Sequence, residues 1–580
     1  MTTKTAAALA LAFTILARPA AAADITVSPG QSIAAALASA EPGDRVLVEA
    51  GTYAEQVTLV NAVELLGGYD ASFSDSNRDP QANPTIITGS GSTTPVLAPT
   101  VGSATRIDGF VITGAGGDGA AGIVVHGGAP VISNNEIRLN LNAGASGGVY
   151  VHGGSVARFE NNWIHDNASL GAGGGFRIET SAVTLSGNTI ENCSARTVGG
   201  GVYVFRSAAT LNNNVIRDCT ATEGGGGVCL QFVPSGFAMN GGTVEDCTAG
   251  FGGGIWLKDE GIATITDVDL NRCSANRGGG IAVLHYCDLG LTDVRFSECT
   301  STIQGGGIYG YQSTIDVLGQ DATALPSAAS FTDCLSGDGV NGTGGGLSFE
   351  FCDGAIERVR FTGCGSDSLG GGLYLLHSGY DIEESVFENC TSIDGGGLAI
   401  RASQSSLLRE SFVRNCNIYG CTATGPSDAT GAPGGGMTLL AMGAFRVATI
   451  GGTIISHGSQ GAAIRCKRGG SAAQTGSPRI DCSMAQLESG NTADAVVGSR
   501  CADAITASAL NFQNVDPLYC QSPPTTYTLQ DCSPGVNSTC IDSVPGRLNR
   551  GAAADGTECT CQTVASVESA TWGKIKSMYR

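Results

Sequence analysis

The stretch that decides the fold is GGGVYV at residues 199–204, where a run of glycines precedes alternating apolar residues. A close variant, GGGIWL, occupies residues 252–257. The alternation has a period of two, which is typical of a β-strand with one buried face. The last glycines of these clusters follow one another about 26 residues apart, with two longer steps. They are Gly122, Gly148, Gly175, Gly201, Gly227, Gly254, Gly280, Gly307, Gly346, Gly372, Gly397 and Gly436.

Each repeat contains two further short runs, such as residues 209–211 and 215–216. Three short strands cannot bury an apolar face alone, but stacked copies of the unit share a continuous core. We therefore predict an all-β, right-handed parallel β-helix with about 26 residues in each coil. Side chains one and three residues after each glycine should point inward, as in the pairs Val202 and Val204, and Ile255 and Leu257.

Two steps between glycines are longer than the rest, Gly307 to Gly346 and Gly397 to Gly436. Solenoids accommodate insertions as loops on one face. The extra residues should therefore bulge from turns, with residues 425–433 as the insertion in the second step, and leave the stack of coils intact.

One position in every coil forms a column of similar residues. Neighbouring coils lie ~4.8 Å apart, which suits Asn ladders and packed thiols. Disulfides between neighbours are the alternative, since bridged Cα atoms lie ~4.4–6.8 Å apart. The column is expected to contain Asn140, Asn167, Cys193, Cys219, Cys247, Cys273, Cys299, Cys334, Cys364, Cys390 and Cys416.

The composition excludes several classes of protein. The 580 residues include 87 glycines, and the formal net charge is −21. Such an acidic chain does not suit nucleic-acid binding, which needs a basic face. The clustered glycines exclude collagen, in which glycine occupies every third position.

The ends differ from the repeats. Residues 1–23 read as a signal peptide, with Lys4, an apolar run and a small-residue cleavage site. We expect an exported protein, extracellular or on the outer cell surface, with no transmembrane segment after cleavage. Residues 24–121 are expected to form an N-terminal cap and the first coils, with a short amphipathic helix at 31–40, and residues 122–465 the repeats.

The C-terminal part is rich in cysteine. Residues 466–565 have irregularly spaced cysteines and are expected to form terminal coils and a cap held by disulfides. Residues 566–580 form a tail with Trp572, Ile575 and Met578 at steps of three, which we expect to act as an export or attachment signal.

Several motifs resemble known families. Residues 27–53, with PGD at 42–44 and GTY at 51–53, resemble the first coil of right-handed β-helix proteins of the pectin-lyase-like superfamily. The GGGI and FxxC elements resemble the repeats of chlamydial polymorphic outer-membrane proteins. The stretch DPLY at 516–519 resembles the terminal coil of secreted bacterial β-helix proteins. The resemblance implies the fold, which hosts many activities.

Lyase chemistry in this fold needs carboxylates, often with calcium, beside a basic residue. The best candidate cluster is Lys258 and Asp259 with His285 one coil further on, and Arg206 shares their position two coils earlier. A solvated loop face is the competing interpretation. Stacked His126 and His152 lack an evident third metal ligand, so no metal site is expected, and calcium is the only cofactor considered.

Aromatic residues recur in every other coil, two residues after the last glycine. As outward side chains they would form a platform for the apolar faces of sugars. The alternative is that they record a duplication and cover neighbouring loops. They are Tyr150, Tyr203, Trp256, Tyr309 and Tyr374.

The catalytic motifs of pectate lyases and polygalacturonases are not found in the sequence. The sequence therefore favours a non-catalytic exported protein, with an adhesion or structural role and a polysaccharide or cell-surface partner. The alternatives are a polysaccharide lyase or glycosidase, and a carbohydrate-binding module.

Overall fold

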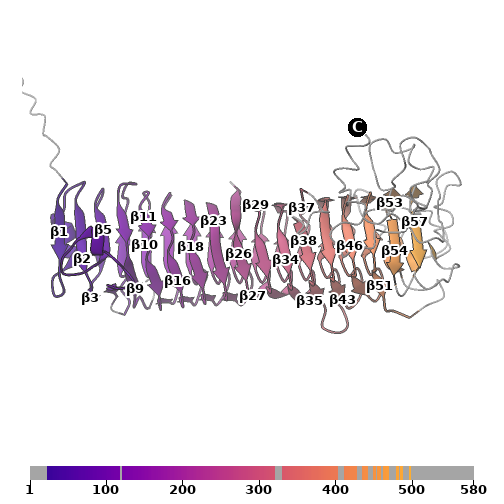
Figure 1. Ribbon diagram of the computed structural model, residues 1–580, viewed down its shortest axis with the longest axis horizontal. Helices are drawn as coiled ribbons and strands as arrows, with labels where there is room; N and C mark the ends of the chain where they lie inside the picture. Colours follow the sequence, from indigo (N-terminus) through magenta and orange to yellow (C-terminus); the bar gives the residue numbers. More distant parts are fainter. Residues whose placement is uncertain are drawn as a thin grey trace, which may run out of the picture.

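The glycine-led repeats form an elongated stack of β-coils, shown along its length in Figure 1. The structure is a computed structural model that describes residues 22–497 with internal gaps. The gaps are residues 90, 118–120, 145, 235, 321–328, 403–410, 427–433, 442–447, 452–453, 459–461, 469–478, 482–483 and 488–495. Residues 1–21 of the expected signal peptide, residues 498–565 of the expected cysteine-rich segment 466–565, and the C-terminal tail lie outside the described residues.

Three parallel sheets of 16, 31 and 11 strands form the walls of the solenoid. One complete coil consists of β22 (Val202–Phe205), β23 (Ala208–Arg217) and β24 (Thr220–Ala221). Strands of successive coils pair in parallel, so the predicted right-handed parallel β-helix is confirmed. The strands of the 16-stranded sheet are β4 (Val57–Thr58), β7 (Val96–Ala98), β10 (Ile123–His126), β14 (Val149–His152), β18 (Phe176–Glu179), β22, β25 (Val228–Gln231), β28 (Ile255–Lys258), β32 (Ile281–Leu284), β36 (Ile308–Tyr311), β40 (Leu347–Glu350), β44 (Leu373–Leu376), β48 (Leu398–Ala402), β52 (Gly434–Ala441), β55 (Ala462–Arg468) and β58 (Val496–Val497).

The register between coils places equivalent residues side by side. Val202 pairs with Val228, which pairs with Ile255 in the next coil. All three are fully buried, as are Val204 and Leu257, so the inward positions predicted from the alternation are confirmed. Further along the chain, four phenylalanine rings from successive coils continue the core, and the centroids of neighbouring rings lie 4.5–5.0 Å apart. They are Phe296, Phe331, Phe361 and Phe387.

The glycines are required where successive coils approach most closely. A Cβ added at Gly226 would lie 2.5 Å from the carbonyl oxygen of Gly253 and 2.6 Å from that of Thr248. Gly225, just before it, has a φ of +63°, a conformation that side-chain-bearing residues rarely adopt. The glycine cluster is therefore a place where backbone packs on backbone.

The predicted column exists, with one correction. Asn140 donates a backbone N–H (3.1 Å) and a side-chain N–H (3.0 Å) to Asn167 Oδ1, which confirms the Asn ladder. At the other end the member is Cys421, whose Sγ lies 3.4 Å from the Cβ position of Gly397, as Cys219 Sγ lies from Gly201. Cys416, the residue predicted there, lies opposite Ser385 in a second column because the register pairs Val386 with Asn417.

This second column was not recognised from the sequence, although Asn recurs there five residues before the first one. Each of its asparagines accepts the backbone N–H of the preceding coil's equivalent residue. It contains Asn135, Asn162, Asn188 and Asn214.

Between residues 193 and 421 the cysteines are buried free thiols, so in these coils the column packs as thiols without disulfides. Their Sγ atoms donate to carbonyl oxygens, for example Cys219 to Arg217 O at 3.2 Å. They are Cys193, Cys219, Cys229, Cys247, Cys273, Cys287, Cys299, Cys334, Cys352, Cys364, Cys390, Cys416 and Cys421.

The two long steps leave the stack unbroken, as predicted. Ile308 of β36 pairs directly with Leu347 of β40, and Leu398 of β48 pairs directly with Met437 of β52. Between β48 and β49 (Ser411–Arg414) the register shifts by five residues, because Val386 pairs with Asn417, which explains why the fixed period indicated Cys416. Of the insertion predicted at 425–433, residues 427–433 lie outside the described residues.

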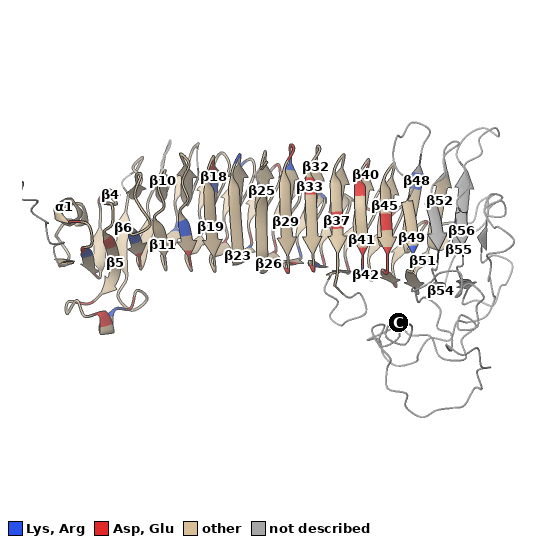
Figure 2. Ribbon diagram, turned by 90° about the horizontal axis from the view of Figure 1, so that it is seen from above, with Lys and Arg blue, Asp and Glu red and all other residues tan. Residues whose placement is uncertain are grey.

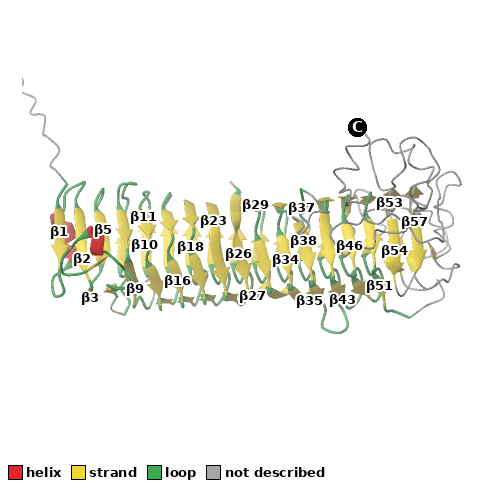
Figure 3. Cartoon of the chain, in the orientation of Figure 1, coloured by secondary structure: helices red, strands yellow, loops and turns green. Residues whose placement is uncertain are grey.

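A helix lies at the N-terminal end of the stack, as Figure 3 shows. It is α1 (Ile33–Ser39), within the predicted range 31–40, and the Ser32 side chain caps it by accepting the N–H of Ala35 at 3.1 Å. Its buried side chains Ile33 and Leu37 belong to the core, so it covers the first coil. In the part of the chain that the structure describes, no helix is long and apolar enough to cross a membrane.

Replacement of Gly226 by alanine should destabilise the solenoid by about 1–3 kcal/mol, because the new methyl group would overlap two carbonyl oxygens. The matched control is Gly290→Ala on an open strand, where the nearest atom to the added Cβ is 3.9 Å away. That change should stay within about 0.5 kcal/mol. Urea unfolding followed by circular dichroism measures both, and equal stability of the two variants would contradict the close approach.

The buried thiols should make the fold sensitive to alkali. Burial raises the pKa of Cys287 to about 11 and that of Cys352 to about 12. An unfolded thiol ionises near ~8.5. Above that pH the unfolded chain binds fewer protons than the folded one, so stability is full below about pH 8 and falls as the pH rises toward 12.

Ser313 and Ser378 occupy the same turn position as these two cysteines and accept their backbone N–H groups. Cys287→Ser and Cys352→Ser should therefore fold normally and lose less stability between pH 8 and pH 10, by about 2 kcal/mol for each thiol replaced. Parallel urea titrations at the two pH values measure this difference. An unchanged pH dependence would show that the two thiols do not contribute.

Candidate functional site

The predicted catalytic cluster forms only in part. Asp259 Oδ1 lies 3.4 Å from His285 Nδ1, as the stacking of coils predicted, and its Oδ2 lies 3.6 Å from Lys258 Nζ. Arg206 is not among these contacts, because its guanidinium stacks on Phe205 at 4.9 Å and on Phe232 at 5.7 Å. The structure therefore brings together three of the four residues.

The remaining contacts of this cluster are structural. Gln231 donates from Nε2 to Asp259 Oδ2 at 2.9 Å, and Tyr203 donates its hydroxyl to Gln231 Oε1 at 2.7 Å. The Lys258 ammonium lies over the Trp256 ring, 4.3 Å from its centroid. Asp259 thus has three partners, and both its oxygens are engaged. This network fits the solvated loop face better than a base that awaits a substrate.

The aromatic column is not the exposed platform that would bind sugars. Tyr203, Trp256, Tyr309 and Tyr374 point outward from the coils, but each is at most 7% exposed. The segments that precede the glycine clusters cover them. A Cβ added at Gly224 would lie 2.1 Å from the Trp256 ring, so glycine allows the backbone to lie directly on that ring.

Phe251 stacks on Trp256 with centroids 5.5 Å apart and planes tilted by 15°. Together with Val198 and Ala172, these side chains form a second apolar cluster outside the main core. Tyr150, the remaining member of the column, is partly buried and donates its hydroxyl to Glu179 Oε2 at 2.7 Å. Four members of the column are therefore covered and do not form an open platform, an arrangement that fits the alternative that they cover loops, and their expected role in ligand binding stays a prediction.

An exposed aromatic residue that the sequence did not single out lies on a different sheet. Trp163 begins β16 (Trp163–His165) and is 44% exposed. It belongs to the 31-stranded sheet, between Glu136 of β12 (Glu136–Arg138) and Thr189 of β20 (Thr189–Glu191). The strand alternation predicted that it points outward, but only the packing around it shows that nothing covers it.

The Trp163 ring is held in a fixed orientation. It stacks on the imidazole of His165, with centroids 3.9 Å apart and planes at 24°, and its Nε1–H donates to Glu191 Oε1 at 2.6 Å. His165 is itself buried between Glu136 Oε1 (3.2 Å from Nε2) and Asp166 Oδ2 (2.7 Å from Nδ1). Both ring nitrogens of His165 are therefore engaged, and the imidazole acts as a support.

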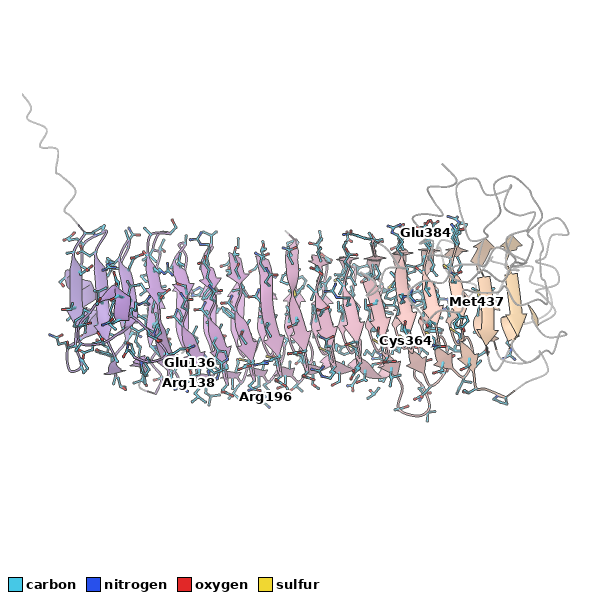
Figure 4. The ribbon with its side chains drawn as sticks, in the orientation of Figure 1. Glu136, Arg138, Arg196, Cys364, Glu384 and Met437 are labelled. Carbon is cyan, nitrogen blue, oxygen red and sulfur yellow. The ribbon has the colours of Figure 1, made fainter. Side chains whose placement is uncertain are left out.

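Charged groups lie next to this ring on the neighbouring strand. Arg138 lies beside Glu136 with Nε 3.1 Å from Oε1, and Figure 4 shows both at the lower edge of the stack. The same two coils expose Leu139, Leu141 and Leu170, each more than half accessible to solvent, but these lie at or beside β13 (Leu141–Asn142) and β17 (Ala168–Ser169) of the 11-stranded sheet. We call Trp163, Glu136 and Arg138 the Trp163 patch.

Replacement of the two tryptophans by alanine should have different effects on the stability of the folded state. Trp256→Ala removes a buried ring and should cost about 3–5 kcal/mol of unfolding free energy. Trp163→Ala removes an exposed ring and should cost less than about 1 kcal/mol. Urea unfolding of the two variants measures this contrast, and equal losses would contradict the burial described here.

Comparisons with known proteins agree with the fold. Residues 100–232 match the family model described as "Right handed beta helix region". A search of curated proteins finds no match. The resemblance of the repeats to the chlamydial proteins remains one of short motifs.

Among solved structures, pectate lyase Pel9A is 14% identical, with 51% of this chain and 76% of that chain covered and a TM-score of 0.30. The catalytic domain of GH87 alpha-1,3-glucanase in complex with nigerose is 15% identical, with 80% and 68% covered and a TM-score of 0.25. A mannuronic acid specific polysaccharide family 6 lyase from human gut microbiota is 11% identical, with 80% and 81% covered and a TM-score of 0.23.

At this level of identity the likeness concerns the fold alone. The family match lies on coils that the structure shows to be consecutive, from β8 (Arg106–Asp108) to β25. Together, the family match and the observed stack of parallel coils identify the chain as a right-handed parallel β-helix protein.

Proposed function

We propose that the chain is a non-catalytic, exported β-helix protein that serves as a rigid adhesion or structural module and contacts a polysaccharide through the Trp163 patch. The observation that carries the proposal is the exposed Trp163 ring, held flat against His165 on a straight wall of paired strands. Aromatic faces of this kind pack on the apolar faces of sugar rings. A ring fixed by two contacts loses little conformational entropy on binding.

The polar neighbours support recognition of a sugar. Glu136 and Arg138 flank the ring on one side and Thr189 on the other, and these groups can accept and donate hydrogen bonds to hydroxyls. Such a mixture of an aromatic anchor and a few polar groups is typical of small-ligand and sugar sites.

Charge favours a neutral polysaccharide over an acidic one. The formal net charge of −21 repels polymers rich in carboxylates. Figure 2 shows the charged residues scattered along the walls, with several acidic residues between β33 (Asp288–Thr292) and β45 (Gly379–Glu383). The partner should therefore be a neutral glycan at the cell surface or in the surrounding matrix.

The arrangement of the predicted catalytic residues supports a non-catalytic role. Asp259 and His285 are paired with each other, and Arg206 packs on aromatic rings. The competing function, a lyase or glycosidase, would need one of these groups to face a bound sugar and a base or acid within hydrogen-bond reach of it.

Binding of the purified protein to insoluble cellulose, chitin and α-glucan, with polygalacturonate beads as the acidic arm, tests the proposal. We expect binding to a neutral polymer that Trp163→Ala weakens at least tenfold. Tyr286→Ala is the matched control, because Tyr286 is 69% exposed but lies on another part of the solenoid, and it should leave binding unchanged.

Equal loss in both variants, or no binding to any neutral polymer, would contradict the assignment of the patch. Release of reducing or unsaturated sugars, with or without calcium, that Asp259→Asn abolishes would replace the proposal with the enzymatic function.

A further inference from the structure

A pair of histidines lies on the 16-stranded sheet, at corresponding positions of two neighbouring coils. His126 ends β10 and His152 ends β14, and the parallel register pairs them directly. The preceding residues, Val125 and Val151, are fully buried, so the alternation directs both imidazoles outward. Their Nδ1 atoms lie 3.2 Å apart, and their ring centroids are 4.6 Å apart.

The surroundings hold these rings in place and leave room for their Nδ1 atoms. Tyr150 stacks on the His152 ring with centroids 4.5 Å apart and planes at 16°. A Cβ added at Gly153 would lie 2.9 Å from His126 Nδ1, so a side chain there would occupy the space beside that nitrogen. The glycine, with φ at +75°, therefore keeps the pair accessible.

The distance between the two nitrogens suits a shared metal ion. Zn²⁺ binds imidazole nitrogen at ~2.0–2.1 Å in tetrahedral geometry, which places two ligand nitrogens about 3.3–3.4 Å apart. The observed separation is therefore within a few tenths of an ångström of that of two ligands on one ion. Imidazole also suits Cu²⁺ and Ni²⁺.

A carboxylate in the next coil helps to fix the support of the pair. Glu179 follows Ile178, the partner of Val151, so the carboxylate lies one coil beyond His152 in the same column. It accepts the Tyr150 hydroxyl and pairs with Arg177 through Nε at 2.8 Å. Through Tyr150 it also fixes the ring that supports His152.

We propose that His126 and His152 bind one divalent transition-metal ion through their Nδ1 atoms, with water in the remaining positions. Across the described residues no three His, Cys, Asp or Glu side chains gather around one point, so this is a two-ligand site. In the free protein one Nδ1–H donates to the other Nδ1. Binding moves that proton to Nε2 of the same ring, so both imidazoles stay neutral and bind through free lone pairs.

Calorimetric titration of the full chain with ZnCl₂ tests this site. Cysteines elsewhere in the chain can also bind zinc, so the comparison is between variants. We expect His126→Ala and His152→Ala each to abolish one binding event of the wild-type protein, or to weaken it at least tenfold. His285→Ala is the matched control, because that imidazole is exposed but pairs with Asp259, and it should leave the titration unchanged.

A second measurement separates imidazole from thiolate binding. Co²⁺ bound by thiolates has an intense near-ultraviolet band that imidazole-bound Co²⁺ lacks, so the signal lost in the histidine variants should be free of that band. His152→Asn serves as a second variant if the alanine change lowers the melting temperature. The proposal is overturned if the wild-type protein binds no zinc, or if both histidine variants titrate like the wild type.

Discussion

The close approach of backbone to backbone along the glycine clusters is the constraint on which the rest of the structure depends. At Gly200 a Cβ would lie 2.4 Å from the carbonyl oxygen of Thr220 and 2.5 Å from that of Gly226. No side chain fits there, so only glycine allows the coil to close at this point. The apolar residues that follow the glycines can then face a narrow core. The same absence of side chains lets the segments before the glycines lie directly over Trp256 and its neighbours. The absence of side chains in the glycine clusters therefore both lets the coil close and lets neighbouring segments cover the aromatic column.

Much of the fold could be predicted because it depends on short periods that repeat. The alternation after each glycine specifies which residues face inward, and the spacing of the glycines aligns them between coils, as Val202, Val228 and Ile255 show. The period does not specify where within a coil an insertion falls. Counting from Cys390 therefore selected Cys416, although the extra residues before Ser411 bring Cys421 into the column.

The sequence predicted which way the aromatic side chains point, but not whether another segment covers them. Trp163 and Trp256 both occupy outward positions of strands, and the strand alternation alone does not separate them. What differs is the segment above each ring: Phe251 and Gly224 cover Trp256, whereas Trp163 rests on His165 and has an open face. Cover of this kind is a tertiary property, because the covering segment comes from a neighbouring coil. For Asp259 and His285, by contrast, the register between coils was sufficient, since both lie at the same position of adjacent coils.

Parallel stacking also decides which chemistry the walls can support. Equivalent side chains become neighbours, so a column favours groups that can lie next to identical groups without repulsion, such as amides, thiols and neutral imidazoles. Like charges in one column repel, and at some positions opposite charges lie side by side instead, as Arg272 beside Asp246 at 2.7 Å and Arg414 beside Glu383 at 2.8 Å, although Glu357 pairs with Glu383 in the register. Two ligands in line can hold an ion from one side, but a straight column cannot surround it. A solenoid of this kind therefore offers open, shallow sites along its walls, and enclosed chemistry would need a loop that projects beyond the coils.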